Sequence, residues 1–138
     1  MSAQAPVIVL IEDEPNLVTM YHVAFRTSGF GLLTAVDAKQ GLDMIAHEKP
    51  DLVLLDIIIP KEQGKVVEFD KRIGFEVLKE IKNNPETKHI PVITLTNLDS
   101  PEDRKRSQEL GALDYIIKAN VLPREVVDRA KKALKGGK

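Results

Sequence analysis

Residues 52–55 read Leu-Val-Leu-Leu, and an aspartate stands on either side of them, Asp51 and Asp56. A half-buried strand alternates apolar and polar residues, whereas this run is apolar at every position, as in a strand covered on both faces. Further short β-rich runs lie at residues 7–11, 32–36, 92–95 and 115–117. Because strands covered on both faces are typical of parallel sheets, the stretch indicates the centre of an α/β fold.

Helix-like segments separate these runs and carry their own start and stop signals. Pro15 suits the first turn of one helix and Gly29 its end, while Asp37 suits the N-cap of the next. Three more helices are expected near Phe75, from Pro101 and from Pro123. Strict alternation of strand and helix predicts a doubly wound, five-stranded parallel sheet in the order 2-1-3-4-5, with helices on both faces. We expect one domain over residues 1–138, with its core at about 7–134.

Composition narrows the classes of function. The formal net charge of -1 gives no broad electrostatic attraction to nucleic acid. The chain has no cysteine, which excludes thiolate chemistry and fits a reducing cytosol. Its first apolar run ends at Glu12 and is too short for a signal peptide or a membrane span. We therefore expect a cytoplasmic protein that binds neither a membrane nor nucleic acid directly.

Polar residues follow the carboxyl ends of four predicted strands: Glu12-Asp13-Glu14, Asp56, Thr96-Asn97 and Lys118. In the order 2-1-3-4-5 these four strands are contiguous, so their ends meet at one edge of the sheet. Clustered carboxylates repel one another, and a hard divalent cation such as Mg²⁺ relieves that repulsion. A carboxylate beside Mg²⁺ and a lysine is suited to attack phosphorus and form an aspartyl phosphate.

Each of these residues also has a structural interpretation. One of the acids at positions 12–14 is equally well placed to cap the helix that starts at Pro15. Thr96 alone is an ordinary strand residue, and Lys118 alone suits a solvated strand end. Asp56 is harder to explain in this way, because a carboxylate at the end of a buried strand is costly without partners. The combination is more specific than any of its members.

Four motifs carry a family resemblance: Glu12-Asp13-Glu14-Pro15-Asn16-Leu17, Asp51 to Pro60, Pro91 to Thr96, and Gly111 to Lys118. Together they resemble the response-regulator receiver domain of two-component signalling, from Val7 to about Leu134. The resemblance implies a flavodoxin-like, doubly wound fold. It also implies that Asp56 is the phosphoacceptor, with Thr96 and Lys118 beside the phosphoryl group.

The same resemblance implies a metal site and a switch. The ligands of Mg²⁺ would be Glu12, Asp13, Asp56 and the main-chain carbonyl of Ile58. Tyr115 would swing inward when Thr96 moves toward the phosphoryl group, and the alternative for Tyr115 is a half-buried strand residue.

These roles predict a regulator rather than an enzyme, because no external substrate is turned over. A sensor histidine kinase or a histidine phosphotransfer protein would donate the phosphoryl group. Since the chain ends soon after the helix from Pro123, we expect a stand-alone receiver whose output is protein contact. The helix from Pro101, the strand at 115–117 and the helix from Pro123 would form the contact surface.

Two other functions stay open from the sequence. One is a phosphorylation-independent, degenerate receiver that acts as an interaction module. The other is a flavodoxin-like cofactor binder, which the acidic loop at residues 12–14 opposes because it repels phosphate.

The chain departs from the family pattern beside the predicted site. Glu12 is one methylene longer than the usual aspartate, which makes Asp13 the safer direct metal ligand. Ala119 stands where the family usually has proline in a cis peptide, and a non-proline cis bond costs about 3 kcal/mol. Either the Lys118–Ala119 bond stays cis or the loop into Asn120 is rebuilt, and we favour the cis bond because Lys118 must point inward.

Three further residues at the site are unusual. Asn97 replaces a small residue, and is expected to narrow access to Asp56 or to bond the phosphoryl group. Ile58 and Leu98 are apolar at positions that influence attack by water, so we hypothesise slow self-dephosphorylation.

An insertion of roughly ten residues, at about 61–73, follows the third strand and exceeds the usual length of such loops. Gly64 and Gly74 compete for the position of the family's turn glycine, and we choose Gly74. Residues 65–70 are expected to form a hairpin arm or a flap over the site, and a surface insertion without a role is the alternative.

Overall fold

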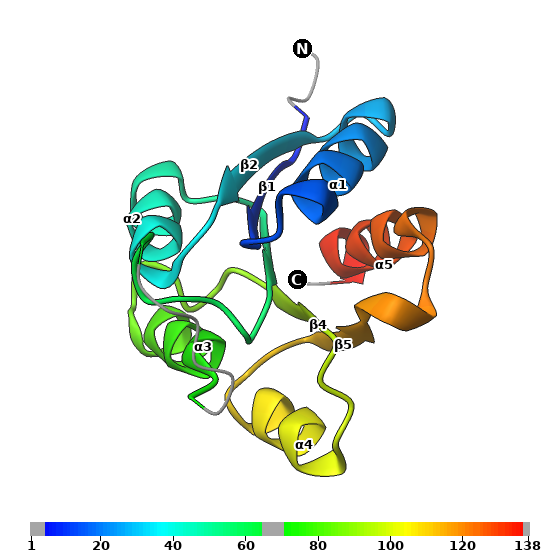
Figure 1. The fold of residues 1–138 in the computed structure, drawn as a ribbon. Helices are drawn as coiled ribbons and strands as arrows, with labels where there is room; N and C mark the ends of the chain where they lie inside the picture. The colour runs from blue at the N-terminus through cyan, green and yellow to red at the C-terminus, as the bar shows by residue number, and fades with distance from the viewer. Residues whose placement is uncertain (1–4, 65–70, 137–138) are drawn as a thin grey trace.

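The computed structural model describes residues 5–64 and 71–136, in which strands and helices alternate (Figure 1). In chain order the elements are β1 (Val7–Ile11), α1 (Pro15–Thr27), β2 (Gly31–Ala35), α2 (Ala38–Glu48), β3 (Leu52–Leu55), α3 (Ile73–Asn83), β4 (Val92–Thr96), α4 (Pro101–Glu109), β5 (Asp114–Ile117), the 3₁₀ turn η1 (Lys118–Asn120) and α5 (Pro123–Gly136). The strands form one parallel sheet in the order β2-β1-β3-β4-β5, which confirms the predicted topology.

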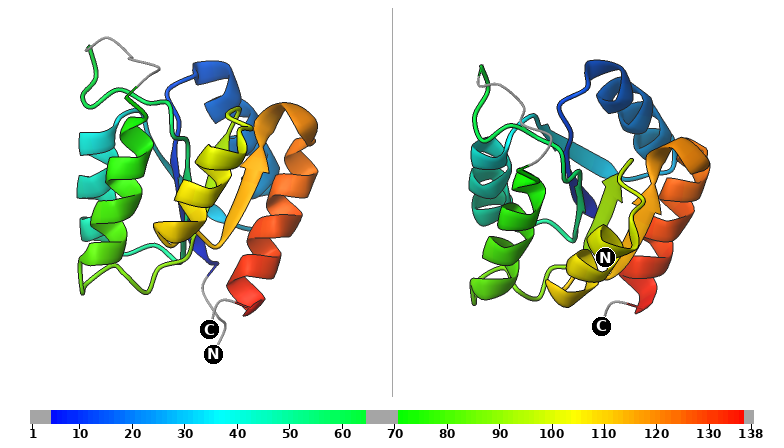
Figure 2. Two further views of the ribbon diagram at one scale, coloured as in Figure 1. Left: turned by 90° about the horizontal axis from the view of Figure 1, so that it is seen from below. Right: turned by 60° about the horizontal axis from the view of Figure 1, so that its bottom comes forward.

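The uniformly apolar strands are explained by helices on both faces of the sheet. Alternate residues of β1 enter opposite cores: Ile8 and Leu10 pack with α1 and α5, whereas Val9 and Ile11 pack with α2 and α3. Figure 1 shows α1 and α5 on one side of the sheet and α2 and α3 on the other. In both views of Figure 2, α4 lies along β5, between α3 and α5.

The helix starts follow the capping signals of the sequence. The side chain of Asp37 accepts a hydrogen bond of 2.6 Å from the backbone N–H of Gln40, which satisfies a free donor in the first turn of α2. Ser100 accepts in the same way from the N–H of Asp103 in α4. Among the described residues, none of the helices is long and apolar enough to cross a bilayer.

Gly74 seats α3 against the end of β3. A Cβ at this position would lie 2.4 Å from the Cα of Ile57 and 2.5 Å from the carbonyl oxygen of Asp56, so only glycine fits without a shift of backbone. Gly64, by contrast, has open space around it and a φ of +89°, as a turn glycine does. This geometry supports the choice of Gly74 as the glycine next to Asp56. The hairpin or flap predicted for residues 65–70 lies outside the described residues.

Candidate functional site

The carboxyl ends of β1, β3, β4 and β5 surround a cavity of about 470 Å³. The cavity exists because each strand stops where its apolar run gives way to polar residues, and parallel strands place all those ends on one edge. The residues predicted to hold the metal and the phosphoryl group all line it: Glu12, Asp13, Asp56, Ile58, Thr96 and Lys118. Tyr115 is not among the residues that line this cavity.

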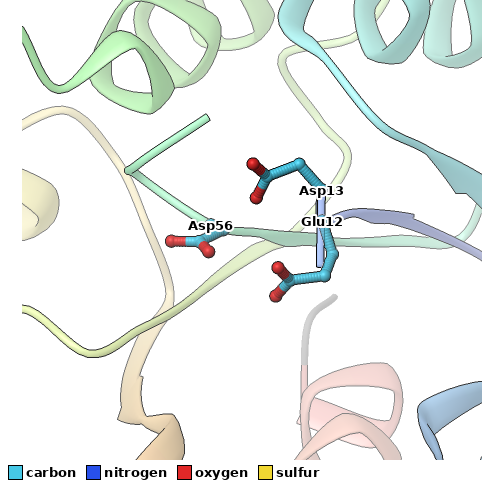
Figure 3. Close-up of side chains that lie close together, drawn as sticks. All are labelled: Glu12, Asp13 and Asp56. Atoms are coloured by element: carbon cyan, nitrogen blue, oxygen red, sulfur yellow. The ribbon is translucent and has the colours of Figure 1, made fainter. Parts of the chain in front are cut away.

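Three carboxylates gather at the ends of β1 and β3, as Figure 3 shows. One oxygen of each of Glu12, Asp13 and Asp56 lies within 4.8 Å of the others. Burial raises the pKa of Glu12, and the charge of Asp56 raises it further. Burial also raises the pKa of Asp13, with a smaller contribution from Asp56. A set of hard oxygen donors held together against repulsion fits a magnesium ion.

Lys118 provides the positive charge of the site. Its Nζ lies 2.7 Å from Oδ2 of Asp56 and 2.8 Å from Oε1 of Glu12, and the side chain is 9% exposed. Burial acts to lower the pKa of Lys118, but the attraction of Asp56 and then of Glu12 outweighs it, so the pKa is raised. The ammonium group therefore stays charged and bridges two strands.

The three consecutive acids have separate tasks. Glu14 caps α1, because its side chain accepts a hydrogen bond of 3.1 Å from the N–H of Asn16. Glu12 is buried, with one oxygen on Lys118 and the other accepting from the N–H of Glu14. Asp13 is half-buried and lines the cavity. This division agrees with Asp13 as the more available direct metal ligand.

Asp56 is fixed by its backbone and by both carboxylate oxygens. Its N–H donates to the carbonyl of Ile11, which ties the end of β3 to β1. Its Oδ1 accepts a hydrogen bond of 3.1 Å from the N–H of Ile58, while its Oδ2 contacts Lys118. The buried carboxylate therefore has a polar partner on each oxygen, the N–H of Ile58 and the ammonium group of Lys118.

Thr96 and Tyr115 meet at the loop residue Leu98. The Oγ1 of Thr96, which is buried, lies 3.5 Å from the N–H of Leu98. The hydroxyl of Tyr115 donates a hydrogen bond of 2.6 Å to the carbonyl of Leu98, and the guanidinium of Arg104 lies 5.0 Å from the ring centroid. Burial raises the pKa of Tyr115 to about 12. Thr96 and Tyr115, the two residues of the predicted switch, thus contact the N–H and the carbonyl of the same residue, Leu98.

The prediction of a cis Lys118–Ala119 bond is wrong, since none of the peptide bonds in residues 5–64 and 71–136 is cis. Instead, the loop is rebuilt: Lys118 opens the 3₁₀ turn η1, and the N–H of Ala119 donates a hydrogen bond of 2.9 Å to Oδ1 of Asn97. Lys118 still reaches the cavity. Asn97 lines the cavity too, with its amide oxygen engaged by Ala119.

Tyr21 of α1 lies near the charges of the site and was not among the residues predicted there. It is 2% exposed, and burial raises its pKa to about 12; the charge of Lys118 acts to lower this pKa, and the charges of Glu12 and Asp56 act to raise it. The available signal was a hydroxyl-bearing residue on the apolar face of a helix that starts at the acidic loop.

A family model described as the response regulator receiver domain matches residues 8–131. The chain belongs to this family. It is 37% identical over 120 residues to a probable cyclic di-GMP phosphodiesterase of Vibrio cholerae serotype O1, covering 84% of this chain and 24% of that protein. It is 34% identical over 128 residues to the alkaline phosphatase synthesis transcriptional regulatory protein PhoP of Bacillus subtilis (strain 168), covering 93% of this chain and 48% of PhoP. The receiver domain thus spans about a quarter and about half of these two relatives.

Solved receiver domains share the fold. The CheY-like response regulator receiver domain protein from Methanospirillum hungatei JF-1 superposes with a TM-score of 0.81 at 25% identity, over 96% of each chain. The BeF3-activated N-terminal receiver domain of RstA from Klebsiella pneumoniae gives 0.78 at 29% identity, over 94% of this chain and 98% of that one. The chain is therefore a response regulator receiver domain of two-component signalling.

Proposed function

We propose that this receiver domain accepts a phosphoryl group on Asp56 with Mg²⁺ bound, from the phosphohistidine of a sensor histidine kinase or a histidine phosphotransfer protein. The observation that carries the proposal is the contact of Lys118 with Asp56 inside a cavity that also holds Asp13. This transfer needs a buried carboxylate, an ammonium group and a second acid close together at one edge of the sheet.

The transfer exchanges one bond to phosphorus for another. A carboxylate oxygen of Asp56 supplies the electron pair of the new P–O bond, and the bond from phosphorus to the leaving nitrogen breaks, with its electron pair remaining on nitrogen. Asp13, Asp56 and the carbonyl of Ile58 are the groups that would hold Mg²⁺ directly. Glu12 would interact with the ion through a water molecule. When bound, the ion supplies positive charge that neutralises the transferring phosphoryl oxygens.

The chain's own residues then receive the new group. Lys118, which divides its ammonium between Asp56 and Glu12, would turn toward a phosphoryl oxygen. The hydroxyl of Thr96 would donate to another oxygen. Asp56 itself is positioned by the N–H of Ile58, so little rearrangement of the acceptor is required.

The response at the surface would pass through Leu98. Movement of Thr96 toward the phosphoryl group displaces a loop whose carbonyl holds the hydroxyl of Tyr115. Loss of that bond frees Tyr115 to turn inward and biases α4, β5 and α5 toward a second arrangement that a target protein binds. The domain turns over no external substrate in this scheme.

The same geometry weighs against a degenerate receiver that does not depend on phosphorylation. That alternative supposes that Ala119 and the insertion keep the receiver in one state. Here the rebuilt turn leaves Nζ of Lys118 at 2.7 Å from Asp56.

Incubation with acetyl phosphate and Mg²⁺, followed by peptide mass spectrometry, tests the proposal. We expect one added phosphoryl group on the peptide that contains Asp56, no adduct in the Asp56→Asn variant, and none when EDTA replaces Mg²⁺. An intact protein that takes up no phosphoryl group, or takes it up equally in Asp56→Asn, contradicts the proposal. Transfer from a phosphorylated histidine phosphotransfer domain is the second assay.

A further inference from the structure

We propose that Asn97 is a positioning residue for Lys118. Its amide oxygen accepts the backbone N–H of Ala119, and this bond holds the turn after β5 so that the ammonium group of Lys118 stays on Asp56. The inference deepens the proposed function and rests on it, because the reaction that Lys118 assists is phosphoryl acceptance by Asp56.

The bond lies where the sheet ends. Thr96 is paired with Ile117 in the last register position of β4 and β5, so Asn97 and Lys118 are the next residues beyond the ladder. The side chain of Asn97 crosses from the end of β4 to the peptide that follows Lys118. It therefore extends the connection between the two strands by one step, beside the cavity that both residues line.

The turn has little internal support of its own. In η1 the N–H of Val121 reaches the carbonyl of Lys118 at 3.5 Å, near the outer limit of a useful hydrogen bond. The bond from Ala119 to Asn97 is much shorter, at 2.9 Å. Of these two restraints on the peptide after Lys118, the side chain of Asn97 supplies the stronger.

The two residue types suit each other chemically. Alanine keeps a backbone N–H that proline would lack, and asparagine offers a neutral carbonyl acceptor at the facing position. An aspartate would accept the same bond, but would add a further negative charge to a cavity that is already lined by Glu12, Asp13, Glu14 and Asp56. A small apolar residue would leave the Ala119 N–H without this partner.

Lys118 depends on its backbone being fixed. Its side chain is 9% exposed and must reach two carboxylates on two other strands. A displacement of its Cα is passed on to Nζ, and misplacement of a catalytic group by about 1 Å lowers reaction rates strongly. Loss of one exposed hydrogen bond predicts a decrease of about twofold to tenfold in the rate of Asp56 phosphorylation.

The experiment compares four variants of the full chain: Asn97→Ala and Asn97→Leu, which lack the acceptor, Asn97→Asp, which keeps one, and Ala119→Ser, which keeps the N–H. The rate of Asp56 modification by acetyl phosphate is measured at saturating Mg²⁺. The ¹⁵N shift of the Lys118 ammonium group and the hydrogen exchange of the Ala119 amide report the geometry directly. Thermal unfolding checks that each variant is folded.

We expect Asn97→Ala and Asn97→Leu to slow modification to a similar extent, because both leave the N–H of Ala119 without its acceptor. Ala119→Ser should react within about twofold of the unaltered chain, because an exposed side chain changes while the bond stays. In Asn97→Ala the Ala119 amide should exchange faster and the Lys118 ammonium signal should shift. In Asn97→Asp the amide should regain its protection.

The outcomes separate the inference from the proposed function. If the unaltered chain forms no Asp56 adduct, the proposed function fails, and unchanged Lys118 and Ala119 signals in Asn97→Ala then overturn the inference as well. If the unaltered chain reacts and Asn97→Ala reacts equally fast, only the inference fails. Should Asn97→Ala unfold, the exchange of the Ala119 amide in Asn97→Leu and in Asn97→Asp decides.

Discussion

The guanidinium group of Arg72 makes two hydrogen bonds to the carboxylate of Asp103, at 2.7 Å from Nε to Oδ1 and 3.2 Å from Nη2 to Oδ2. Arg72 precedes α3 in a left-handed conformation with φ of 48°, and Asp103 lies in the first turn of α4. The hydroxyl of Ser100 donates to the same carboxylate. Arg72, near the end of the predicted insertion at 61–73, thereby links this segment to α4, a helix of the predicted contact surface for target proteins.

Breaking this pair should destabilise the fold. Asp103 is buried and Arg72 is 31% exposed at its side chain, so solvent screens part of the attraction, and we expect a coupling of about 1 kcal/mol. Because Arg72 has further interactions, a double-mutant cycle of Arg72→Ala with Asp103→Asn isolates the pair. Urea unfolding at neutral pH measures it, and a coupling of zero contradicts the prediction.

The same coupling should depend on pH. The hydrogen bond from Arg72 lowers the pKa of Asp103 against the opposing effect of burial, and the bond from Ser100 lowers it further. A folded-state pKa below the unfolded value gives stability that is present above about pH 4 and is lost as the pH falls through the folded pKa. Urea unfolding from pH 7 to pH 3 should show the difference between the unaltered chain and Arg72→Ala shrinking below about pH 4. If this difference in stability grows as the pH falls, the prediction is wrong.

The sheet and the strand-end cluster were predictable because both follow from local patterns. The run Leu52–Leu55 is apolar throughout and stops at Asp56, so its burial and the position of the acid are visible in one short stretch. Topology then brings the other strand ends to the same edge. Four strands with clear carboxyl ends are enough to predict that Lys118 lies close to Asp56.

The features that escaped prediction are pairs of residues far apart in the sequence. Asn97 and Ala119 were each recognised as unusual, but their separation of 22 residues hides the hydrogen bond from the N–H of Ala119 to the side chain of Asn97. Arg72 and Asp103 are 31 residues apart and carry no local signal of pairing. The burial of Tyr21 near the charges of the site depends on how α1 is rotated against the sheet, which periodicity alone does not determine.

Removing one site carboxylate should stabilise the metal-free protein. Burial, with the help of Asp56, raises the pKa of Asp13 in the folded chain. Its stability contribution is therefore fully present below about pH 4 and is lost as the pH rises through the folded pKa, so at pH 7 the charged group is a net cost. Because Asp13 is partly exposed, we expect Asp13→Asn to gain about 0.5 kcal/mol, or roughly 2 °C, in EDTA.

Mg²⁺ should reverse that order. Ligand binding to the folded state alone raises stability, and the chain with Asp13 should gain more from the ion than Asp13→Asn does. Thermal unfolding with EDTA and with Mg²⁺ tests both halves of the prediction. The exposed Asp128→Asn is the matched control, and should show neither the gain in EDTA nor the loss of the magnesium effect. Equal behaviour of the two variants contradicts Asp13 as a ligand.

Both tyrosines should resist ionisation. Burial raises the pKa of Tyr21 and of Tyr115 to about 12, and the chain contains 2 tyrosines. Their contribution to stability is present below the unfolded pKa of about 10 and is lost as the pH rises toward the folded value. Ultraviolet absorbance should show no tyrosinate step near pH 10 while the protein remains folded. Tyr115→Phe should leave the single late step of Tyr21, and an early step in that variant contradicts the burial of Tyr21.

Self-dephosphorylation should be slow once Asp56 carries a phosphoryl group. Ile58 and Leu98 line the cavity beside Asp56, and neither side chain has an atom that can orient an attacking water. Placing a polar group there, as Ile58→Asn or Leu98→Gln, should accelerate loss of the phosphoryl group by about tenfold. The apolar replacements Ile58→Val and Leu98→Met are matched controls and should leave the rate close to that of the unaltered chain. Decay of the adduct is followed by mass spectrometry after removal of acetyl phosphate, and a lifetime as short as seconds in the unaltered chain contradicts the prediction.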